Sequence, residues 1–494
     1  MNNTASIGQD VEEAIWANIH ISVTNAYTAF EEYKKTSPAI KALFLQTIAA
    51  EIVLAAPSLI PVTQQETALP VARLEGELQR TVKQLNLFAD LLLEGSWVRA
   101  VIDVKENPSV DIRQVQVSLG VVAVFGASNF PFAFSVAGGD TVSALAAGCP
   151  VVYKAHPGHP ETSTLVAGCI ARAAAKTGLN PAVFTMLSSN GIEAGQALVK
   201  HPLISAVAFT GSFRGGKALF DAAAKRPQPI PVYAEMGSVN PVFILPRMLH
   251  DNGDDIAAKI VGSNHQGVGQ FCTNPGIVVM PPLHGVQSFM AKSAELVGAS
   301  KSGIMLTAGM QVAYQYGVQK FAQKTQVRLL AAGQPGSEAK TATPHLFVTD
   351  ADNFLNDQEL HEELFGPSAL FVETSQKAEV FTIARQLQGQ LTATIWGTDE
   401  DLAEFADLIH ILEGKAGRLL INGVPTGVEV TAAMIHGGPY PATTDARTTS
   451  VGTDAIYRFT RPVCYQNFPQ FLLPDALKDE NPLNITRMRN GKLV

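Results

Sequence analysis

The chain is organised around one stretch, Gly267-Val268-Gly269-Gln270-Phe271-Cys272-Thr273-Asn274-Pro275-Gly276, which places a cysteine between glycines and small polar residues. The apolar run Ile277 to Met280 follows at once and predicts a strand. Glycine allows backbone conformations that are closed to other residues and leaves room for a ligand to approach the sulfur. The pattern therefore predicts that Cys272 is presented to a ligand.

A buried structural role is the alternative for any free cysteine, because cysteine is among the most buried residue types. Cys149, Cys169 and Cys464 stand in surroundings that fit this alternative. Cys272 differs from them by its glycine-rich surroundings. Its assignment as a catalytic residue depends on partners elsewhere in the chain.

Length and composition limit the class of protein. A chain of 494 residues exceeds the size of one core, which favours two large domains plus an appendage. The net charge of -8 gives no basic surface for nucleic acid or an anionic membrane, so we expect small molecules and other copies of the chain as partners. The four cysteines show no CxxC spacing, and neither a leader nor an apolar run of about 18 residues is present. We therefore expect a soluble cytoplasmic protein with no membrane span.

Hydrophobic periodicity predicts helices at the start of the chain and exposed strands after them. Apolar positions recur at helical spacing over residues 11–95. Alternation over Trp97–Val101 and Val110–Val117 predicts strands that are exposed on one face and could meet another subunit. A loop rich in Gly, Pro and Thr after residue 423 leads to a strand-like segment, Ile456–Tyr465.

In the middle of the chain, predicted strands and helices alternate as in an α/β protein. From 120 to 245 short apolar strands alternate with helices, which predicts an open parallel sheet of the nucleotide-binding kind. In this interpretation the strand Pro241–Leu245 closes the first sheet. The same rhythm over residues 252–421 predicts a second α/β unit that holds Cys272.

A glycine-rich turn follows the predicted strand Ala206–Phe209. It nearly matches a P-loop, but Ala218 stands where a Ser or Thr hydroxyl would bind magnesium, so phosphoryl transfer is poorly supported. The turn at Gly211 and Ser212 could still direct helix N-terminal amides at a phosphate. Glycine kept for packing is the alternative.

Three polar residues stand where predicted strands end or begin. Glu235 ends the apolar strand Pro231–Ala234, where ligands of α/β sheets usually bind, and partial burial would raise its pKa towards that of a general base. A solvated charge is the alternative for Glu235. Asn129 follows another strand and could donate its amide to an oxyanion or cap a turn. Glu363 precedes a further strand.

Several motifs occur in the order and spacing of the aldehyde dehydrogenase superfamily, which the chain resembles over nearly its whole length. They are Ser128-Asn129-Phe130-Pro131, Phe209-Thr210-Gly211-Ser212, Glu235-Met236-Gly237, Gly269-Gln270-Phe271-Cys272 and Glu363-Leu364-Phe365-Gly366-Pro367. The resemblance implies an α/β aldehyde dehydrogenase fold in three parts. These are a Rossmann-like cofactor domain (1–99 and 119–233), an α/β catalytic domain (234–435), and a β-strand oligomerisation arm with the C-terminal tail (100–118 and 436–494). A homodimer or homotetramer is implied as well.

The resemblance also implies the catalytic roles. Cys272 is the expected nucleophile, and Glu235 is the expected base that activates the deacylating water. The Asn129 side chain and the backbone amide of Cys272 are expected to form the oxyanion hole. No metal is expected.

For a nicotinamide cofactor the resemblance implies four contacts. Lys154 and Glu363 are expected at the riboses, and Phe365 is expected near the nicotinamide. The turn at Gly211 and Ser212 is expected to face the pyrophosphate.

Departures from the usual family pattern resemble a subgroup that contains α-ketoglutaric semialdehyde (2,5-dioxovalerate) dehydrogenases and a bacterial fatty aldehyde dehydrogenase. These departures are Gly237-Ser238, Thr273-Asn274-Pro275, Lys154-Ala155-His156-Pro157 and His436-Gly437-Gly438-Pro439-Tyr440-Pro441. We therefore expect oxidation of 2,5-dioxopentanoate to 2-oxoglutarate, with medium or long aliphatic aldehydes as the alternative. Arg447, Arg458 and Arg461 are candidates to bind a substrate carboxylate, although each fits a surface charge equally well.

The expected cofactor preference depends on Pro157, which stands three residues beyond Lys154 where NAD-preferring members carry a glutamate. Without that carboxylate nothing repels a 2′-phosphate, and Lys154 can pair with it. His156 and His159 could add polar contacts to the ribose or could face solvent. We therefore expect NADP to be preferred and NAD to be accepted.

Two other classes of function need comparison. A cofactor-free thiol hydrolase would need a histidine base, and none of the eleven histidines lies in a motif that suggests one. A non-catalytic scaffold of the same fold would tolerate the loss of Cys272 or Glu235, and both are present. The sequence therefore favours NAD(P)-dependent aldehyde oxidation.

Overall fold

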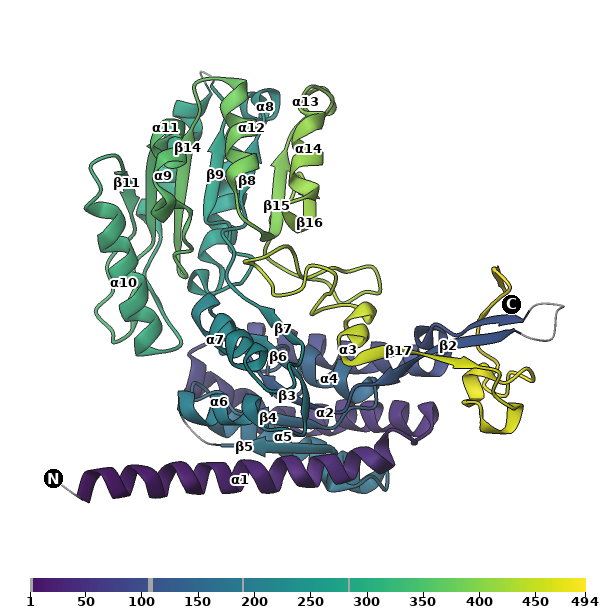
Figure 1. The fold of residues 1–494 in the computed structure, drawn as a ribbon. Coiled ribbons are helices and arrows are strands. Elements are labelled where there is room, and N and C mark those ends of the chain that lie inside the picture. Colours follow the sequence, from purple (N-terminus) through teal and green to yellow (C-terminus); the bar gives the residue numbers. More distant parts are fainter. Residues whose placement is uncertain (1–2, 105–109, 189–190, 283–284) are drawn as a thin grey trace.

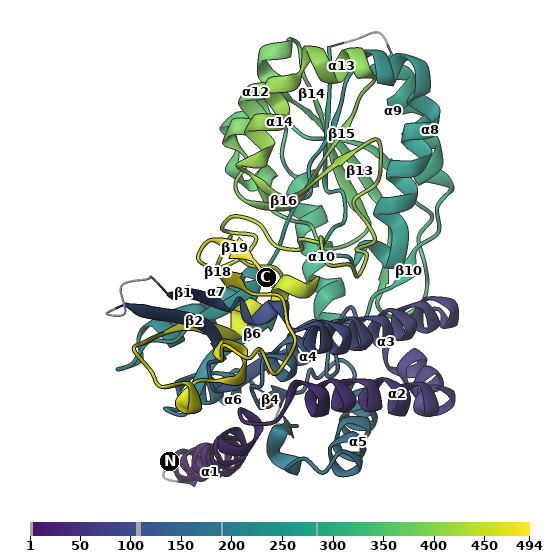
Figure 2. The same ribbon diagram turned by 90° about the vertical axis from the view of Figure 1, so that its right-hand side faces the viewer.

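The computed structural model describes residues 3–104, 110–188, 191–282 and 285–494. Two lobes, each built on a parallel sheet, lie one above the other, and a smaller sheet extends from the lower lobe as an arm (Figure 1). The turned view shows the helices of the N-terminal region lying along the lower lobe (Figure 2). The predicted α/β fold class is confirmed.

The first part of the chain is helical, as predicted. It forms α1 (Asn3–Tyr33), α2 (Pro38–Thr67) and α3 (Val71–Glu94). The Ser37 side chain caps α2 by accepting a hydrogen bond from the Ile40 amide, and Gly95 ends α3 in a left-handed conformation that glycine adopts without strain.

Helix α2 has the length and apolar composition of a membrane span, a feature that the sequence prediction did not pick out. One face of α2 is buried against the protein. It packs against α3 and α5 (Pro160–Lys176), and its buried Glu51 pairs with Arg172 and Lys176 of α5. A charged side chain with two such partners indicates a protein neighbour on that face.

The lower lobe contains an all-parallel sheet in the order β5-β4-β3-β6-β7. The strands are β3 (Val121–Phe125), β4 (Val151–Lys154), β5 (Phe184–Leu187), β6 (Ile204–Thr210) and β7 (Val232–Glu235), and the connecting helices are α4 (Gly139–Ala146), α5, α6 (Ile192–Lys200) and α7 (Phe213–Ala224). Every residue of β3 is buried, which explains its continuous apolar sequence. Because the strands are parallel, Lys154 at the end of β4 and Glu235 at the end of β7 lie along the same edge of the sheet, with β3 and β6 between them.

The upper lobe contains a second sheet in the order β11-β13-β14-β9-β8-β15-β16, parallel except for β11. Its strands are β8 (Val242–Ile244), β9 (Ile277–Met280), β11 (Arg328–Ala332), β13 (His345–Asp350), β14 (Ser368–Glu373), β15 (Gln390–Trp396) and β16 (Ala416–Ile421). Its helices are α8 (Pro246–His265), α9 (Val286–Ala299), α10 (Ala308–Ala322), α11 (Ala351–Asn356), α12 (Lys377–Gln386), α13 (Asp399–Glu404) and α14 (Ala406–Glu413). A short pair, β10 (Gly303–Ile304) and β12 (Thr341–Ala342), lies beside this sheet.

The prediction that Pro241–Leu245 closes the first sheet is wrong, because β8 pairs with β9 and β15 of the second sheet. The side chain of Gln390 explains why the chain passes from the first sheet to the second. Its Oε1 accepts hydrogen bonds from the Ser238 hydroxyl and from the amides of Val239 and Asn240, which fixes the chain on the second sheet directly after β7.

The arm is a sheet in the order β17-β2-β1-β18-β19. Its strands are β1 (Val101–Val104), β2 (Asp111–Ser118), β17 (Thr460–Gln466), β18 (Met488–Arg489) and β19 (Lys492–Leu493). Residues 105–109 of the predicted arm lie outside the described residues.

Two predicted strand boundaries in the arm are wrong. Residues Ser96–Val98 form a 3-10 helix, because the Trp97 ring is buried in the core below the sheet and Arg99 reverses the chain with φ 46°. Residues Thr453–Phe459 form another 3-10 helix, whose Ile456 and Phe459 are buried in the same core. Strand β17 therefore begins only at Thr460.

Candidate active site

The loop that carries Cys272 lies between α8 and β9 and is held by buried amide side chains. The Asn240 side chain donates to the carbonyls of Cys272 and Asn274, at 2.8 and 2.9 Å. Asn274 in turn donates to the carbonyl of Gly366 at 3.0 Å. Gly269 has φ 66°, and a Cβ there would collide with the backbone of Gly366, so only glycine fits. These contacts fix the position of Cys272.

The surroundings of the cysteines separate Cys272 from two of the others. Cys149 and Cys169 are fully buried, as the structural alternative predicts, whereas Cys272 is half-buried at the wall of a cavity. The prediction that Cys464 is buried is wrong, because it lies exposed on the outer strand β17 of the arm.

Cys272 contacts a histidine that contacts Glu235. The Sγ of Cys272 lies 3.3 Å from Nε2 of His436, and the same nitrogen lies 2.9 Å from Oε1 of Glu235. The Ser450 hydroxyl donates to Oε2 of Glu235 at 2.6 Å. Both Glu235 and His436 are buried. The three side chains form one connected group that can move a proton from the thiol.

The position of His436 comes from the loop between β16 and the arm. The His436 amide donates to the Thr449 hydroxyl at 2.8 Å, and the Ser450 amide donates to the His436 carbonyl at 2.8 Å. The amide of Met236 donates to the carbonyl of Ala442 at 2.8 Å, which ties this loop to the end of β7. Ser450 therefore positions both His436 and Glu235.

Burial and charge set the protonation states at the site. Burial raises the pKa of the Cys272 thiol well above its usual range, and the neighbouring Glu235 carboxylate raises it further. For Glu235, burial acts to raise the pKa, but the charge and hydrogen bond of His436 and the hydrogen bond from Ser450 hold it below its ordinary value. The prediction that burial raises the pKa of Glu235 is therefore wrong. An ionised Glu235 faces a neutral thiol.

The expectation that no histidine is a candidate base for the Cys272 thiol is also wrong. His436 lies in a sequence motif that the resemblance had marked, but 164 residues separate it from Cys272. Only the packing of the loop brings the two together. The ligand atoms of Glu235, Cys272 and His436 lie within 4.8 Å of one another, so the group could also hold a metal ion.

Asn129 lies beside the nucleophile loop. Its Nδ2 donates to the carbonyl of Gln270 at 2.9 Å, and its own carbonyl accepts from Nη2 of Arg73 at 2.8 Å. One amide hydrogen of Asn129 is used in this way, and the second is left to serve an oxyanion. The oxyanion role stays a prediction.

The predicted cofactor residues lie at the carboxyl edge of the lower sheet. Lys154 ends β4, is half-buried and makes no ion pair within the described ranges, which fits an anionic ligand. The Gly211 amide does not face a ligand, because it donates to the Glu235 carbonyl at 3.1 Å. Ser212 caps α7 by accepting from the Gly215 amide at 3.2 Å. The exposed N-terminal amides of α7 are thus the part of this turn that could meet a phosphate.

Glu363 and Phe365 lie on the segment that passes next to the nucleophile loop. Burial raises the pKa of Glu363 to about 8, against the hydrogen bond from the Ser238 amide. At neutral pH its carboxyl is mostly protonated and can donate a hydrogen bond to a hydroxyl oxygen. Phe365 is half-buried.

His156 and His159 differ in whether their side chains could contact a cofactor. His156 is half-buried, with Nδ1 accepting from the Gly158 amide, and burial lowers its pKa to about 4. It therefore brings no charge to a phosphate. His159 is fully buried, contacts the Ala127 carbonyl and Ser163, and faces neither ribose nor solvent.

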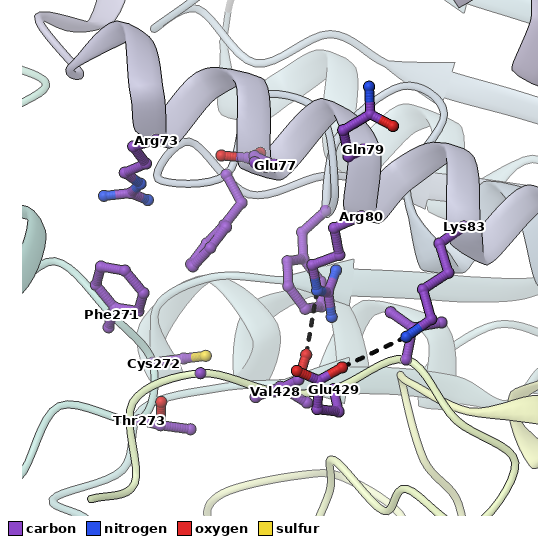
Figure 3. Close-up of a pocket in the computed structure, with 15 residues that line it drawn as sticks. Arg73, Glu77, Gln79, Arg80, Lys83, Phe271, Cys272, Thr273, Val428 and Glu429 are labelled. Atoms are coloured by element: carbon purple, nitrogen blue, oxygen red, sulfur yellow. Dashed lines mark hydrogen bonds and ion pairs between the residues drawn. The ribbon is translucent and has the colours of Figure 1, made fainter.

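A cavity of about 450 Å³ opens beside Cys272 (Figure 3). Its walls come from α3, from the segment after β3, from the nucleophile loop and from residues 427–430. Phenylalanine and valine side chains form part of the wall, and α3 adds charged side chains. The lining includes Arg73, Glu77, Arg80, Lys83, Phe130, Phe134, Phe271, Cys272, Val428 and Glu429.

The three arginines predicted as carboxylate ligands do not line this cavity. Arg458 is buried and pairs with Asp140 at 2.7 Å, and Arg447 is exposed and pairs with Asp445 at 2.8 Å. Arg461 is exposed on β17. The sequence prediction missed Arg73 and Arg80, because the face that α3 buries became known only from the fold.

Comparisons with known proteins agree with this geometry. A model of the aldehyde dehydrogenase family matches residues 3–460. The chain is 47% identical over 475 residues to an alpha-ketoglutaric semialdehyde dehydrogenase of Acinetobacter baylyi, which covers 95% of this chain and 90% of that protein. It is 48% identical over 484 residues to alpha-ketoglutaric semialdehyde dehydrogenase 2 of Azospirillum brasilense, with 97% and 92% covered.

Solved structures with low identity share the fold. An E. coli NADP dependent enzyme superposes with a TM-score of 0.77 at 19% identity, over 91% of this chain and 90% of that one. Proline utilization A of Bradyrhizobium japonicum superposes with a TM-score of 0.78 at 20% identity. The match covers 91% of this chain and 45% of that longer protein.

Proposed function

The chain belongs to the aldehyde dehydrogenase family, and from this premise we propose that it oxidises 2,5-dioxopentanoate (α-ketoglutaric semialdehyde) to 2-oxoglutarate with a nicotinamide cofactor. The observation that carries the proposal is the contact of Cys272 with His436 and Glu235 at the wall of a cavity that also holds two arginines. The names of the two bacterial relatives support the substrate.

The reaction begins with addition of the Cys272 sulfur to the aldehyde carbon. The thiol is neutral at rest, so its proton has to leave. Nε2 of His436, 3.3 Å from the sulfur and 2.9 Å from Oε1 of Glu235, can take it up as its own proton passes to the Glu235 carboxylate and on to solvent. The aldehyde oxygen becomes an oxyanion, which the free amide hydrogen of Asn129 and the Cys272 backbone amide would stabilise. A thiohemiacetal results.

Oxidation of the thiohemiacetal to a thioester needs a hydride acceptor, which the nicotinamide ring supplies when the cofactor is bound. Lys154, the N-terminus of α7 and Glu363 would hold the cofactor at the edge of the lower sheet. The half-buried ammonium of Lys154 fits an anionic group, and the carboxyl of Glu363 fits a hydroxyl.

Hydrolysis of the thioester restores the enzyme. Glu235 is ionised and accepts a proton from the attacking water, while Ser450 fixes the orientation of the carboxylate. The net reaction consumes one aldehyde, one oxidised cofactor and one water, and it yields one carboxylate, one reduced cofactor and two protons. Each proton transfer has a named acceptor in this chain.

The finer assignments belong to the same proposal. NADP is preferred over NAD, because Pro157 brings no carboxylate to the ribose and Lys154 is free to pair with a 2′-phosphate. The lower lobe binds the cofactor and the upper lobe carries the nucleophile. Phe471 and Leu472, exposed in the tail beside the arm, support a homodimer or homotetramer. We also propose a cytoplasmic location.

One observation favours a second substrate class. The cavity walls include Phe130, Phe134, Phe271 and Val428, which would also accept the chain of a medium or long aliphatic aldehyde. The contact between Cys272 and His436 alone would also fit a cofactor-free thiol hydrolase.

A panel of aldehydes tested against both cofactors decides among these functions. Reduced nicotinamide is followed by absorbance with 2,5-dioxopentanoate and decanal, each with NADP and NAD, at one ionic strength. We expect the highest kcat/KM with 2,5-dioxopentanoate and NADP. A higher value with decanal would replace the substrate, and turnover of an activated ester alone, without any aldehyde oxidation, would support the hydrolase.

A further inference from the structure

The cavity next to Cys272 receives its charge from one face of α3. Arg73, Glu77 and Arg80 follow one another at four and three residues, a spacing that puts them on the same side of a helix. Figure 3 shows the side chains of Arg73 and Arg80 reaching from α3 towards the side of the cavity that carries Cys272, whereas the carboxyl of Glu77 stays close to the helix. Any polar end of a bound aldehyde has to meet this face.

The Arg80 side chain is fixed in position, but only one of its nitrogens donates a hydrogen bond. Its Nε donates to the carbonyl of Val428 at 3.2 Å, and its guanidinium lies 4.9 Å from the centre of the Phe134 ring. Both terminal nitrogens, Nη1 and Nη2, are buried and find no hydrogen-bond partner among the described residues. A buried guanidinium edge without acceptors is costly, and a carboxylate binds such an edge with two parallel hydrogen bonds.

The other charged groups of the cavity are less available. Arg73 uses Nη2 on the Asn129 carbonyl and stacks between Phe130 and Phe271, so only Nη1 remains. Lys83 pairs with Glu429 at 3.4 Å, and both side chains are exposed. Among the cations that line the cavity in the described chain, only Arg80 offers a two-nitrogen edge.

Glu77 is the one carboxyl that α3 contributes to this cavity, and its contacts turn one oxygen away from a ligand. Its Oε1 accepts from the amides of Phe132 and Ala133, at 2.8 and 3.0 Å. Burial raises its pKa, which reduces its charge and its repulsion of an anion. The cavity therefore favours an anionic group at Arg80.

We propose that Arg80 is the specificity-determining residue of the site and binds the distal carboxylate of the substrate through Nη1 and Nη2. This inference rests on the proposed function, because it needs an aldehyde that carries a carboxylate. Val428 and Phe134 fix the guanidinium, so the carboxylate meets a preformed partner while the aldehyde end reaches Cys272.

Paired substrates test the assignment. We compare 2,5-dioxopentanoate with pentanal, which has the same number of carbons and no carboxylate, in the wild-type enzyme and in Arg80→Met. Losing one partner of a buried charge pair is expected to lower kcat/KM for the semialdehyde by about 30-fold or more, mainly through KM. The value for pentanal should change by less than about threefold.

Two further variants serve as a conservative substitution and as a control. Arg80→Lys keeps a positive charge but lacks the two-nitrogen edge, so it should recover part of the loss, and it keeps the test valid if Arg80→Met does not fold. Arg461→Met removes an exposed arginine of β17 that lies outside the cavity and should leave both aldehydes unaffected. Equal losses for both aldehydes in Arg80→Met, or a larger loss in Arg461→Met, would overturn the assignment.

Binding of glutarate provides a readout that does not depend on turnover. This five-carbon dicarboxylate should raise the Tm of the wild type and of Arg461→Met, but not that of Arg80→Met. An equal shift in all three proteins would contradict the role of Arg80 while leaving the proposed function intact. If the wild type oxidised pentanal but not 2,5-dioxopentanoate, the proposed substrate itself would fail, and the role of Arg80 with it.

Discussion

The two sides of Cys272 are built in different ways. On the cofactor side, Lys154 and Glu235 end two strands of one parallel sheet, and the N-terminus of α7 follows β6 at the same edge. On the substrate side, the cavity is closed by α3 and by residues 427–430, which meet through the bond from Arg80 to Val428 across 348 residues of sequence.

This structural difference corresponds to two functions, cofactor binding on one side of Cys272 and selection of the aldehyde on the other. Strand ends of a parallel sheet hold the same relative positions whatever ligand they bind, which suits a cofactor common to a whole family. The face of a helix and a loop can change their side chains without disturbing a sheet, which suits the choice of an aldehyde. The two sides should therefore respond separately to mutation, whereas changes at the centre should affect both.

The largest effect is expected at the centre. Cys272→Ala removes the nucleophile and should lower kcat by about 10⁴-fold or more for every aldehyde and with both cofactors. The measurement is steady-state formation of reduced nicotinamide. Cys464→Ser, on the exposed strand β17, is the matched control and should retain wild-type activity. More than a trace of activity in Cys272→Ala would refute the nucleophile.

Glu235→Gln should slow only the second half of the reaction. A neutral amide cannot take the proton of the attacking water, so the steady-state rate should fall by about 10²–10⁴-fold. Rapid mixing should still show a burst of reduced nicotinamide close to one per active site. An unchanged steady-state rate would remove Glu235 from this role.

His436→Gln should slow the first half instead, because glutamine can donate to the sulfur but cannot accept its proton. We expect a loss of about 10²-fold and no burst. If His436→Gln kept a burst at the wild-type rate, the thiol proton would leave by another route.

The pH dependence of Cys272 alkylation checks the same contact. Because the pKa of the thiol is raised, the unreactive protonated form dominates at neutral pH. In the Cys464→Ser background, the rate with iodoacetamide should therefore still be rising at a pH about one unit above 8.5, the ordinary pKa of a thiol being about 8.5. A plateau below that pH would contradict the raised pKa.

The smallest effect is expected on the cofactor side. Lys154→Met should lower kcat/KM for NADP by about tenfold and that for NAD by less, because only NADP carries the 2′-phosphate. The KM of the aldehyde should stay constant, which would show that the two sides act separately. Equal losses with both cofactors would place Lys154 at a group that NAD and NADP share.

The sequence alone allowed correct prediction where chemistry and local pattern coincide. Buried parallel strands such as β3 read as continuous apolar runs, and Glu235 follows such a run directly. Cys272 was distinguishable from the buried cysteines because glycines surround it in the sequence, and Gly267 and Gly269 have positive φ. These signals depend on a few neighbouring residues, so they can be read without the fold.

The missed features all depend on contacts between distant segments. His436 reaches Cys272 because Thr449 and Ser450 hold its backbone, and β8 leaves the first sheet because Gln390 binds the residues before it. Arg80 lies on a helix whose buried face cannot be identified until the cavity exists. The sign of the Glu235 pKa shift likewise followed from His436, a partner that no local pattern indicates.

Trapping the acyl-enzyme tests the central claim most directly, namely that Cys272 carries the substrate carbon while Glu235 releases it. Glu235→Gln is mixed with 2,5-dioxopentanoate and NADP, quenched in acid, digested and analysed by mass spectrometry. We predict an acyl adduct on the peptide that contains Cys272, in an amount equal to the burst, and no adduct when NADP is omitted. A burst without any adduct on that peptide, or an adduct on a different cysteine, would contradict the account.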